Sequence, residues 1–238
     1  MSESGERGSR LAELVQVMDT LRVNCPWDAR QTHASLAPHL LEEAYEALDA
    51  LAADDQAALR EELGDVLLQV VFHARIAQER TDGTGYDIDD VAADIIDKLT
   101  RRHPHVFGNA AVSGPDEVYR NWDAIKASER AAKAGDRPVS ALDGVPMSQP
   151  SLSLAAQLLR RAGRAGAPES LAREPADAVS PLGQELLDLV MRAQQAGLDP
   201  ELELRKAARA YAGRVRAWEA AAPGHSGEAR GPAGPLAR

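Results

Sequence analysis

The sequence predicts an all-α protein, and its composition and apolar spacing are the observations behind that prediction. Aromatic residues make up 4% of the 238 residues, whereas the helix-favouring residues Ala, Leu, Arg and Glu are abundant. Apolar residues recur at intervals of three and four along several segments, which is the period of an amphipathic helix. At 238 residues the chain is long enough for one large domain or two small domains with real cores, and its hydrophobic share of 44% is ordinary for a globular protein.

The first part of the chain is expected to form five helices. Pro38 suits the first turn of a helix, Asp54 and Asp55 can cap the next one, and Asp87 with Asp90 forms a box-like cap. A Gly-Pro pair near residue 115 precedes the last of the five. The expected helices cover about residues 9–22, 38–53, 55–80, 87–102 and 115–132.

Two apolar features of this part are assigned to the core. The residues Val91, Ile95, Ile96 and Leu99 share one face of the fourth helix, and we expect that face to be buried. Trp27, in the loop after the first helix, either caps the core or stacks on a base, and we favour the core because most tryptophans are largely buried.

The second part of the chain differs in composition. Residues 133–150 are rich in Gly and Pro and are expected to form a linker. Three further helices are expected near residues 151–164, 181–196 and 200–221, with fewer large apolar residues. Residues 222–238 have the composition of a disordered tail.

Charge and cysteine use exclude several classes of partner. The net charge of -10 argues against binding to nucleic acid or to an anionic membrane, because both repel negative charge. The only cysteine, Cys25, excludes an intramolecular disulfide framework and fits a reducing cytosol. The chain start lacks the apolar region of a signal peptide, and no apolar run approaches membrane-spanning length. We therefore expect a cytoplasmic protein.

Two short acidic motifs are the best candidates for chemistry. Residues 42–65 hold nine acidic residues against one basic residue, Arg60. Glu62, Asp65 and Gln69 fall on one stripe that borders an apolar helix face, where carboxylates are poorly solvated without a partner. Hard carboxylates at this density favour Mg²⁺, with Mn²⁺ as an alternative, although most charge runs simply face solvent. The candidate ligands and catalytic residues are Glu42, Glu43, Glu46, Glu62 and Asp65.

Four later residues have the chemistry to bind a phosphorylated substrate. Lys98 and Arg102, one helical turn apart, can hold phosphate oxygens or simply complement the helix dipole. Trp122 and Lys126 can offer a ring to a base and an ammonium to a phosphate, or can pack as ordinary surface residues. A Gly-x-x-x-x-Gly-Lys phosphate loop does not occur in the sequence, so a P-loop mechanism of nucleotide hydrolysis has no support.

The acidic motifs resemble the signature of the MazG family of nucleoside triphosphate pyrophosphohydrolases. Glu-Glu-x-x-Glu at residues 42–46 and Glu-x-x-Asp at 62–65 have fifteen residues between them. The likeness extends over residues 11–132 and includes segments 25–28, 31–32, 98–107 and 122–126. It implies a four-helix-bundle-type module, completed by a homodimer, that converts a nucleoside triphosphate to the monophosphate and pyrophosphate with Mg²⁺.

The resemblance also assigns roles and a domain plan. It implies that the five carboxylates hold metal and activate water, that Lys98, Arg102 and Lys126 bind phosphates, and that Trp122 lines the nucleotide pocket. Residues 9–132 would be the catalytic module and residues 151–221 a degenerate second module without the Glu-Glu-x-x-Glu motif. The alternatives are a narrower all-α dNTP or phosphoribosyl-ATP pyrophosphohydrolase, and a protein that senses nucleotides without turnover.

Overall fold

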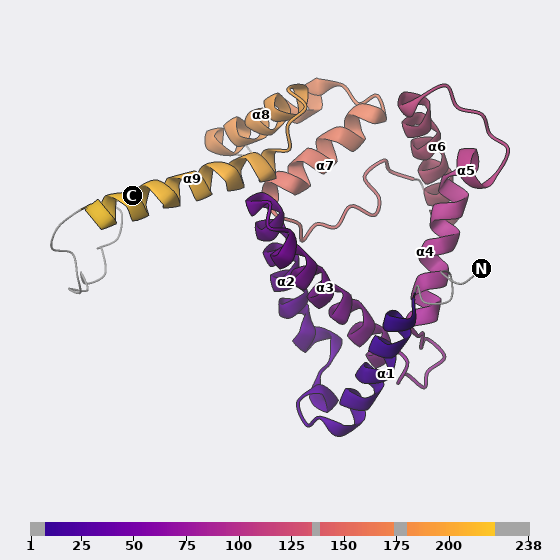
Figure 1. Cartoon of the computed structure of the whole chain (residues 1–238). Helices are drawn as coiled ribbons and strands as arrows, with labels where there is room; N and C mark the ends of the chain where they lie inside the picture. The colour runs from indigo at the N-terminus through magenta and orange to yellow at the C-terminus, as the bar shows by residue number, and fades with distance from the viewer. Residues whose placement is uncertain (1–7, 135–138, 174–179, 222–238) are drawn as a thin grey trace. The chain divides into compact units, whose positions relative to one another are not determined.

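The computed structural model of the chain describes residues 8–134, 139–173 and 180–221. Regular structure in these residues is helical throughout, which confirms the predicted all-α class (Figure 1). None of the described helices is long and apolar enough to cross a membrane. The helices are α1 (Ser9–Asn24), α2 (His33–Ala53), α3 (Gln56–Ala77), α4 (Ile88–Arg102), α5 (Pro104–Phe107), α6 (Pro115–Ala134), α7 (Ser151–Arg164), α8 (Pro181–Gln195) and α9 (Pro200–Ala221).

The chain divides into two compact units, Met1–Trp122 and Asp123–Arg238, with the boundary inside α6. In the first unit α2 and α3 form an antiparallel helical hairpin, and α1 and α4 each pack on α3. The core of this unit comprises Met18 of α1, Leu36 of α2, and Val71 and Phe72 of α3. These side chains are almost completely buried and hold the hairpin against α1.

A buried arginine fastens the loop after α1 to this core. Arg22 donates from Nε and Nη2 to the two carboxylate oxygens of Glu79, at 2.8 Å each. Its Nη1 donates to the backbone carbonyls of Asp28 and Gln31. The loop thereby places the Trp27 ring edge-on to Phe72, with ring centroids 6.4 Å apart. Trp27 contacts the core as expected, although 55% of its surface stays exposed.

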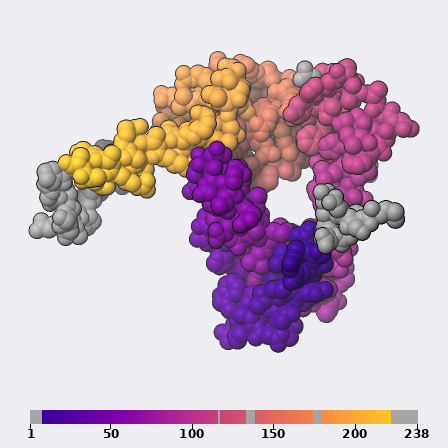
Figure 2. Space-filling model, viewed as in Figure 1, coloured from indigo at the N-terminus to yellow at the C-terminus, as the bar shows by residue number. Residues whose placement is uncertain are grey.

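In the second unit α7, α8 and α9 pack on one another. Leu142, Leu158, Leu171 and Met191 are among the residues that line an apolar groove along α7 and α8. The C-terminal half of α9 extends beyond the other two helices (Figures 1 and 2). The predicted tail 222–238, and residues 135–138 of the predicted linker, lie outside the described residues.

The second helix begins earlier than expected. It was predicted to start near Pro38, but α2 starts at His33 and contains Pro38 in its interior. Thr32 and Ser35 form a reciprocal capping box, in which each side chain accepts a hydrogen bond from the other's backbone N–H. This cap and the burial of Leu36 outweigh the hydrogen bond that the proline cannot donate.

The expected core face of α4 is not buried within the described chain. Ile95, Ile96 and Leu99 are 43%, 59% and 45% exposed, and α4 contains no buried residue. The predicted cap is present, since the Asp87 side chain accepts from the backbone N–H groups of Asp89 and Asp90. The helix was therefore predicted correctly, while burial of its apolar face was wrong for the single chain.

Candidate functional site

The candidate site lies where α2 and α3 face each other, and the turn between them sets its register. Asp54 ends α2 in the left-handed conformation, with φ of 54°. Asp55 then caps α3 by accepting hydrogen bonds from Ala57 and Ala58 N–H, both at 3.0 Å. Because the helices run antiparallel from this tight turn, residues at equal distances before and after it lie opposite each other. Glu43 and Asp65 are such a pair.

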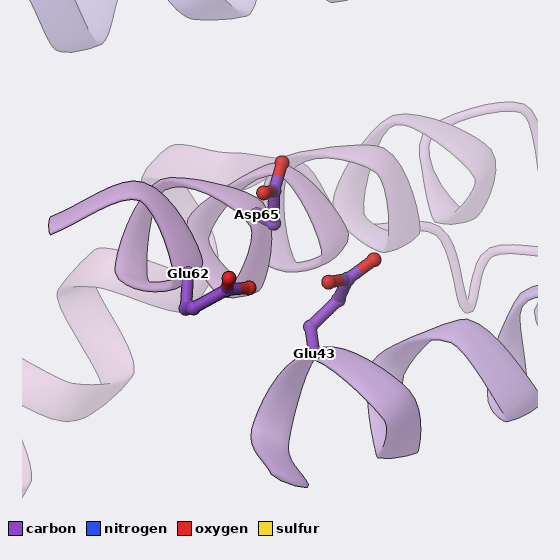
Figure 3. A group of neighbouring side chains, drawn as sticks. All are labelled: Glu43, Glu62 and Asp65. Carbon is purple, nitrogen blue, oxygen red and sulfur yellow. The ribbon is translucent and has the colours of Figure 1, made fainter. Parts of the chain in front are cut away.

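Three carboxylates meet at this level of the hairpin. Figure 3 shows Glu43 extending from α2 towards Glu62 and Asp65 of α3. One oxygen from each side chain lies within 4.8 Å of the others, and all three residues are half-buried. Three acidic groups this close together repel one another unless protons or a cation lie among them.

The electrostatic effect of this crowding is visible in two pKa values. Burial, followed by the negative charges of Asp65 and Glu46, raises the pKa of Glu43. Burial, followed by the charges of Glu46 and Asp65, raises the pKa of Glu62. The groups that raise both pKa values lie on α2 and α3, so the hairpin by itself concentrates the negative charge.

The other two predicted carboxylates lie beside this cluster rather than in it. Glu42 and Glu46 line an open groove along α2 together with Tyr45 and Asp49. Glu42 approaches His39, with 3.6 Å between a carboxylate oxygen and Nδ1. Glu46 is close enough to the cluster for its charge to raise the pKa of Glu62. The structure thus selects Glu43 from the pair Glu42 and Glu43 as the residue facing α3.

The predicted substrate-binding residues lie on two other helices. Lys98 and Arg102 lie on α4, which packs on α3. Trp122 lies on α6 at the end of the first unit, and its ring centroid is 5.8 Å from that of His103. Lys126 follows one turn later, within the second unit. Within the first unit, three of the predicted carboxylates meet between α2 and α3, whereas Lys98 and Arg102 lie on α4.

The same hairpin holds a histidine pair that the sequence did not predict. His33 and His73 stack with ring centroids 5.1 Å apart, and their Nδ1 atoms lie 2.8 Å from each other. No local motif joins residues forty positions apart, so only the folded hairpin shows the contact. The spacing of Asp65, Gln69 and His73 at intervals of four was the available signal, since it places them on one face of α3.

The donor set fits a hard divalent cation. Three carboxylates with an acidic neighbour provide oxygen ligands and negative charge, which are the ligands that Mg²⁺ and Mn²⁺ prefer. Burial and, after it, the neighbouring negative charges raise the pKa values of Glu43 and Glu62, so the ionised cluster is unfavourable and a bound cation would stabilise it.

Comparisons with known proteins agree on one family. Residues 31–107 match the model of the MazG nucleotide pyrophosphohydrolase domain, a range that contains the carboxylate cluster, Lys98 and Arg102. A Streptomyces cacaoi protein described as an uncharacterized 26.1 kDa protein is 46% identical over 89% of this chain and 84% of its own length. The Thermotoga maritima nucleoside triphosphate pyrophosphohydrolase/pyrophosphatase MazG is 37% identical over 90% of this chain and 87% of its own. The Escherichia coli K12 nucleoside triphosphate pyrophosphohydrolase is 42% identical over 80% and 70%.

Proposed function

The chain belongs to the MazG family of nucleotide pyrophosphohydrolases, and from this premise we propose that it hydrolyses nucleoside triphosphates in a Mg²⁺-dependent reaction. The products are the nucleoside monophosphate and pyrophosphate, from ribose or deoxyribose substrates. The observation that carries the proposal is the carboxylate cluster of Glu43, Glu62 and Asp65, whose oxygens converge within 4.8 Å inside the family's matched region.

In this proposal Glu43, Glu62 and Asp65 hold the cation, and Glu42 and Glu46 extend the site along α2. When bound, Mg²⁺ supplies positive charge that acidifies a water molecule and offsets the charge of the leaving pyrophosphate. Mn²⁺ has the same preference for carboxylate oxygens and is expected to substitute for it.

In this proposal the chain's own residues bind the substrate and accept the proton. The water oxygen forms a new bond to one phosphorus of the bridge between the α- and β-phosphates, and the bond from that phosphorus to the bridging oxygen breaks. The water proton passes to an α2 glutamate not engaged with the cation. Lys98, Arg102 and Lys126 bind the triphosphate oxygens, Arg102 through its forked guanidinium and the lysines as point charges. Trp122 lines the pocket for the base.

The proposal includes a homodimer located in the cytoplasm. The exposed apolar residues Ile95, Ile96 and Leu99 of α4 support a partner subunit that covers them and completes a four-helix bundle. Residues 9–132 act as the catalytic module in this scheme, and residues 151–221 as a degenerate second module.

The decisive experiment is a product analysis with Mg²⁺ and a panel of NTPs and dNTPs. Glu62→Gln removes one charged oxygen of the cluster with little change in shape, so we expect monophosphate and pyrophosphate from the wild type and near-complete loss in the variant. Glu61→Gln is the matched control, because it makes the same substitution at the neighbouring exposed position.

The other outcomes separate the alternatives. Diphosphate with inorganic phosphate would contradict cleavage between the α- and β-phosphates. Turnover of one deoxynucleotide or of phosphoribosyl-ATP alone would indicate a narrower hydrolase. Nucleotide binding without any product would support a sensor.

A further inference from the structure

A polar row on α3 continues beyond the carboxylate cluster. Asp65, Gln69 and His73 are spaced four residues apart, so they occupy one face of α3 in successive turns. At one end of the row Asp65 faces Glu43 of α2. At the other end His73 contacts His33 of α2, with 2.8 Å between the Nδ1 atoms. Gln69 therefore lies between two polar contacts that join the same pair of helices.

The middle of this row is buried and lacks hydrogen-bond partners. Gln69 is only 5% exposed, and its Oε1 atom is buried without a partner. The Nε2 atom of His73, one turn further along α3, is also buried without a hydrogen-bond partner. Native proteins satisfy nearly all buried polar atoms, because an unpaired one costs stability. The two unpaired atoms lie on residues one helical turn apart, which suggests that they belong to one hydrogen-bonding arrangement.

The contact with His33 relates the protonation of the two Nδ1 atoms, since only one of them can carry the shared hydrogen. One Nδ1 must donate to the other at 2.8 Å. Burial, followed by the charge of His33, lowers the pKa of His73, which favours the neutral form of its ring. With the exposed His33 as donor, His73 accepts at Nδ1 and holds its proton at Nε2. The buried Nε2–H is then a donor, and the buried Oε1 of Gln69 is the acceptor that it lacks.

We propose that His33, His73 and Gln69 form a polar relay that orients the carboxylate of Asp65 for metal binding. His33 donates to His73. His73 reaches Gln69 Oε1 through one buried water, because neither of these two atoms has a direct partner. The relay is completed when the Gln69 amide, four residues from Asp65 on the same face of α3, donates to that carboxylate. The relay rests on the proposed function, because it assumes that Asp65 is a metal ligand. Gln69 is a positioning residue in this scheme and does not contact the substrate.

The physical gain is a ligand that is fixed before the cation arrives. A carboxylate that already accepts a hydrogen bond from a supporting side chain loses less conformational freedom when it coordinates a metal. Removing such supporting residues typically lowers metal affinity by about 10–100-fold.

The first test measures Mn²⁺ binding to the full chain by electron paramagnetic resonance, together with the melting temperature. Gln69→Leu replaces the buried amide with an apolar side chain of similar size. We expect Mn²⁺ affinity to fall by about tenfold or more, and the melting temperature, measured without metal, shows that the variant is folded. Unchanged Mn²⁺ affinity would overturn the relay, whatever the melting temperature does.

The second test uses two amides that each mimic one ring nitrogen of His73. The amide nitrogen of Gln lies near the position of Nε2, and that of Asn lies near Nδ1. We expect His73→Gln to keep Mn²⁺ affinity near that of the wild type and His73→Asn to lose it as Gln69→Leu does. Equal losses, or the reverse order, would overturn the relay. Failure of the wild type itself to bind Mn²⁺ would instead overturn the proposed function.

Discussion

At the scale of one residue, Glu43 shows how an ionised carboxylate of the site lowers the stability of the folded protein. Burial and its acidic neighbours raise its pKa above the unfolded value of 4.5. The folded state therefore binds this proton more tightly than the unfolded state does, and stability falls as the pH rises through the two pKa values. Above both pKa values the ionised Glu43 carboxylate lowers the stability of the folded protein, and a bound cation would offset that cost.

We therefore predict that Glu43→Gln raises the melting temperature of the metal-free protein at pH 7. The gain should shrink towards pH 4, where protonation neutralises Glu43 in the wild type. Adding Mg²⁺ should raise the melting temperature of the wild type much more than that of the variant, because the variant has lost a ligand. Thermal melts across this pH range, with and without EDTA, provide the measurement.

Glu219→Gln is the control for net charge, because it removes one negative charge from an exposed position of α9. It should leave both the pH profile and the response to Mg²⁺ unchanged. A lower melting temperature for Glu43→Gln at pH 7 would show that the carboxylate is stabilised in the folded protein, contrary to its raised pKa.

At the scale of one element, Gly64 weakens α3 in the middle of the Glu-x-x-Asp motif. A glycine costs a helix interior about 1 kcal/mol relative to alanine. A Cβ added at Gly64 would meet no described atom within 4 Å apart from its chain neighbours and the backbone of its own helix. We predict that Gly64→Ala raises the free energy of unfolding by about 1 kcal/mol in urea titrations.

Gly163 of α7 has equally open surroundings, so Gly163→Ala should stabilise by a similar amount. A gain for Gly163→Ala together with a loss for Gly64→Ala would contradict the prediction. It would mean that something outside the single chain covers Gly64 in the folded protein.

Local signals predicted the elements well, and long-range packing explains where they failed. The caps at Asp55 and Asp87 were predictable because they depend on hydrogen bonds within four residues. The start of α2 was missed because the capping box of Thr32 and Ser35 competes with the preference of Pro38 for a first turn. The choice of Glu43 over Glu42 depends on how α2 is rotated against α3, which no local pattern contains.

At the scale of the whole molecule, α4 is the element that a single chain leaves incomplete. It is strongly amphipathic in sequence, yet Ile96 is 59% exposed and the helix has no buried residue. The same helix carries Lys98 and Arg102. A partner that covers the apolar side of α4 would thus also help to position these two cations, and assembly and catalysis would depend on the same helix.

If cations from one subunit serve the carboxylates of the other, two inactive variants should restore activity when mixed. Glu62→Gln removes a carboxylate of the cluster, and Lys98→Ala removes a cation from α4. After unfolding and refolding together, half of the dimers are mixed, and each has one intact site and one site lacking both groups. We expect about a quarter of wild-type pyrophosphate release, with light scattering to confirm the dimer. No recovery from a dimeric mixture would place Lys98 beside the carboxylates of its own chain, and a monomer would remove the basis for a shared site.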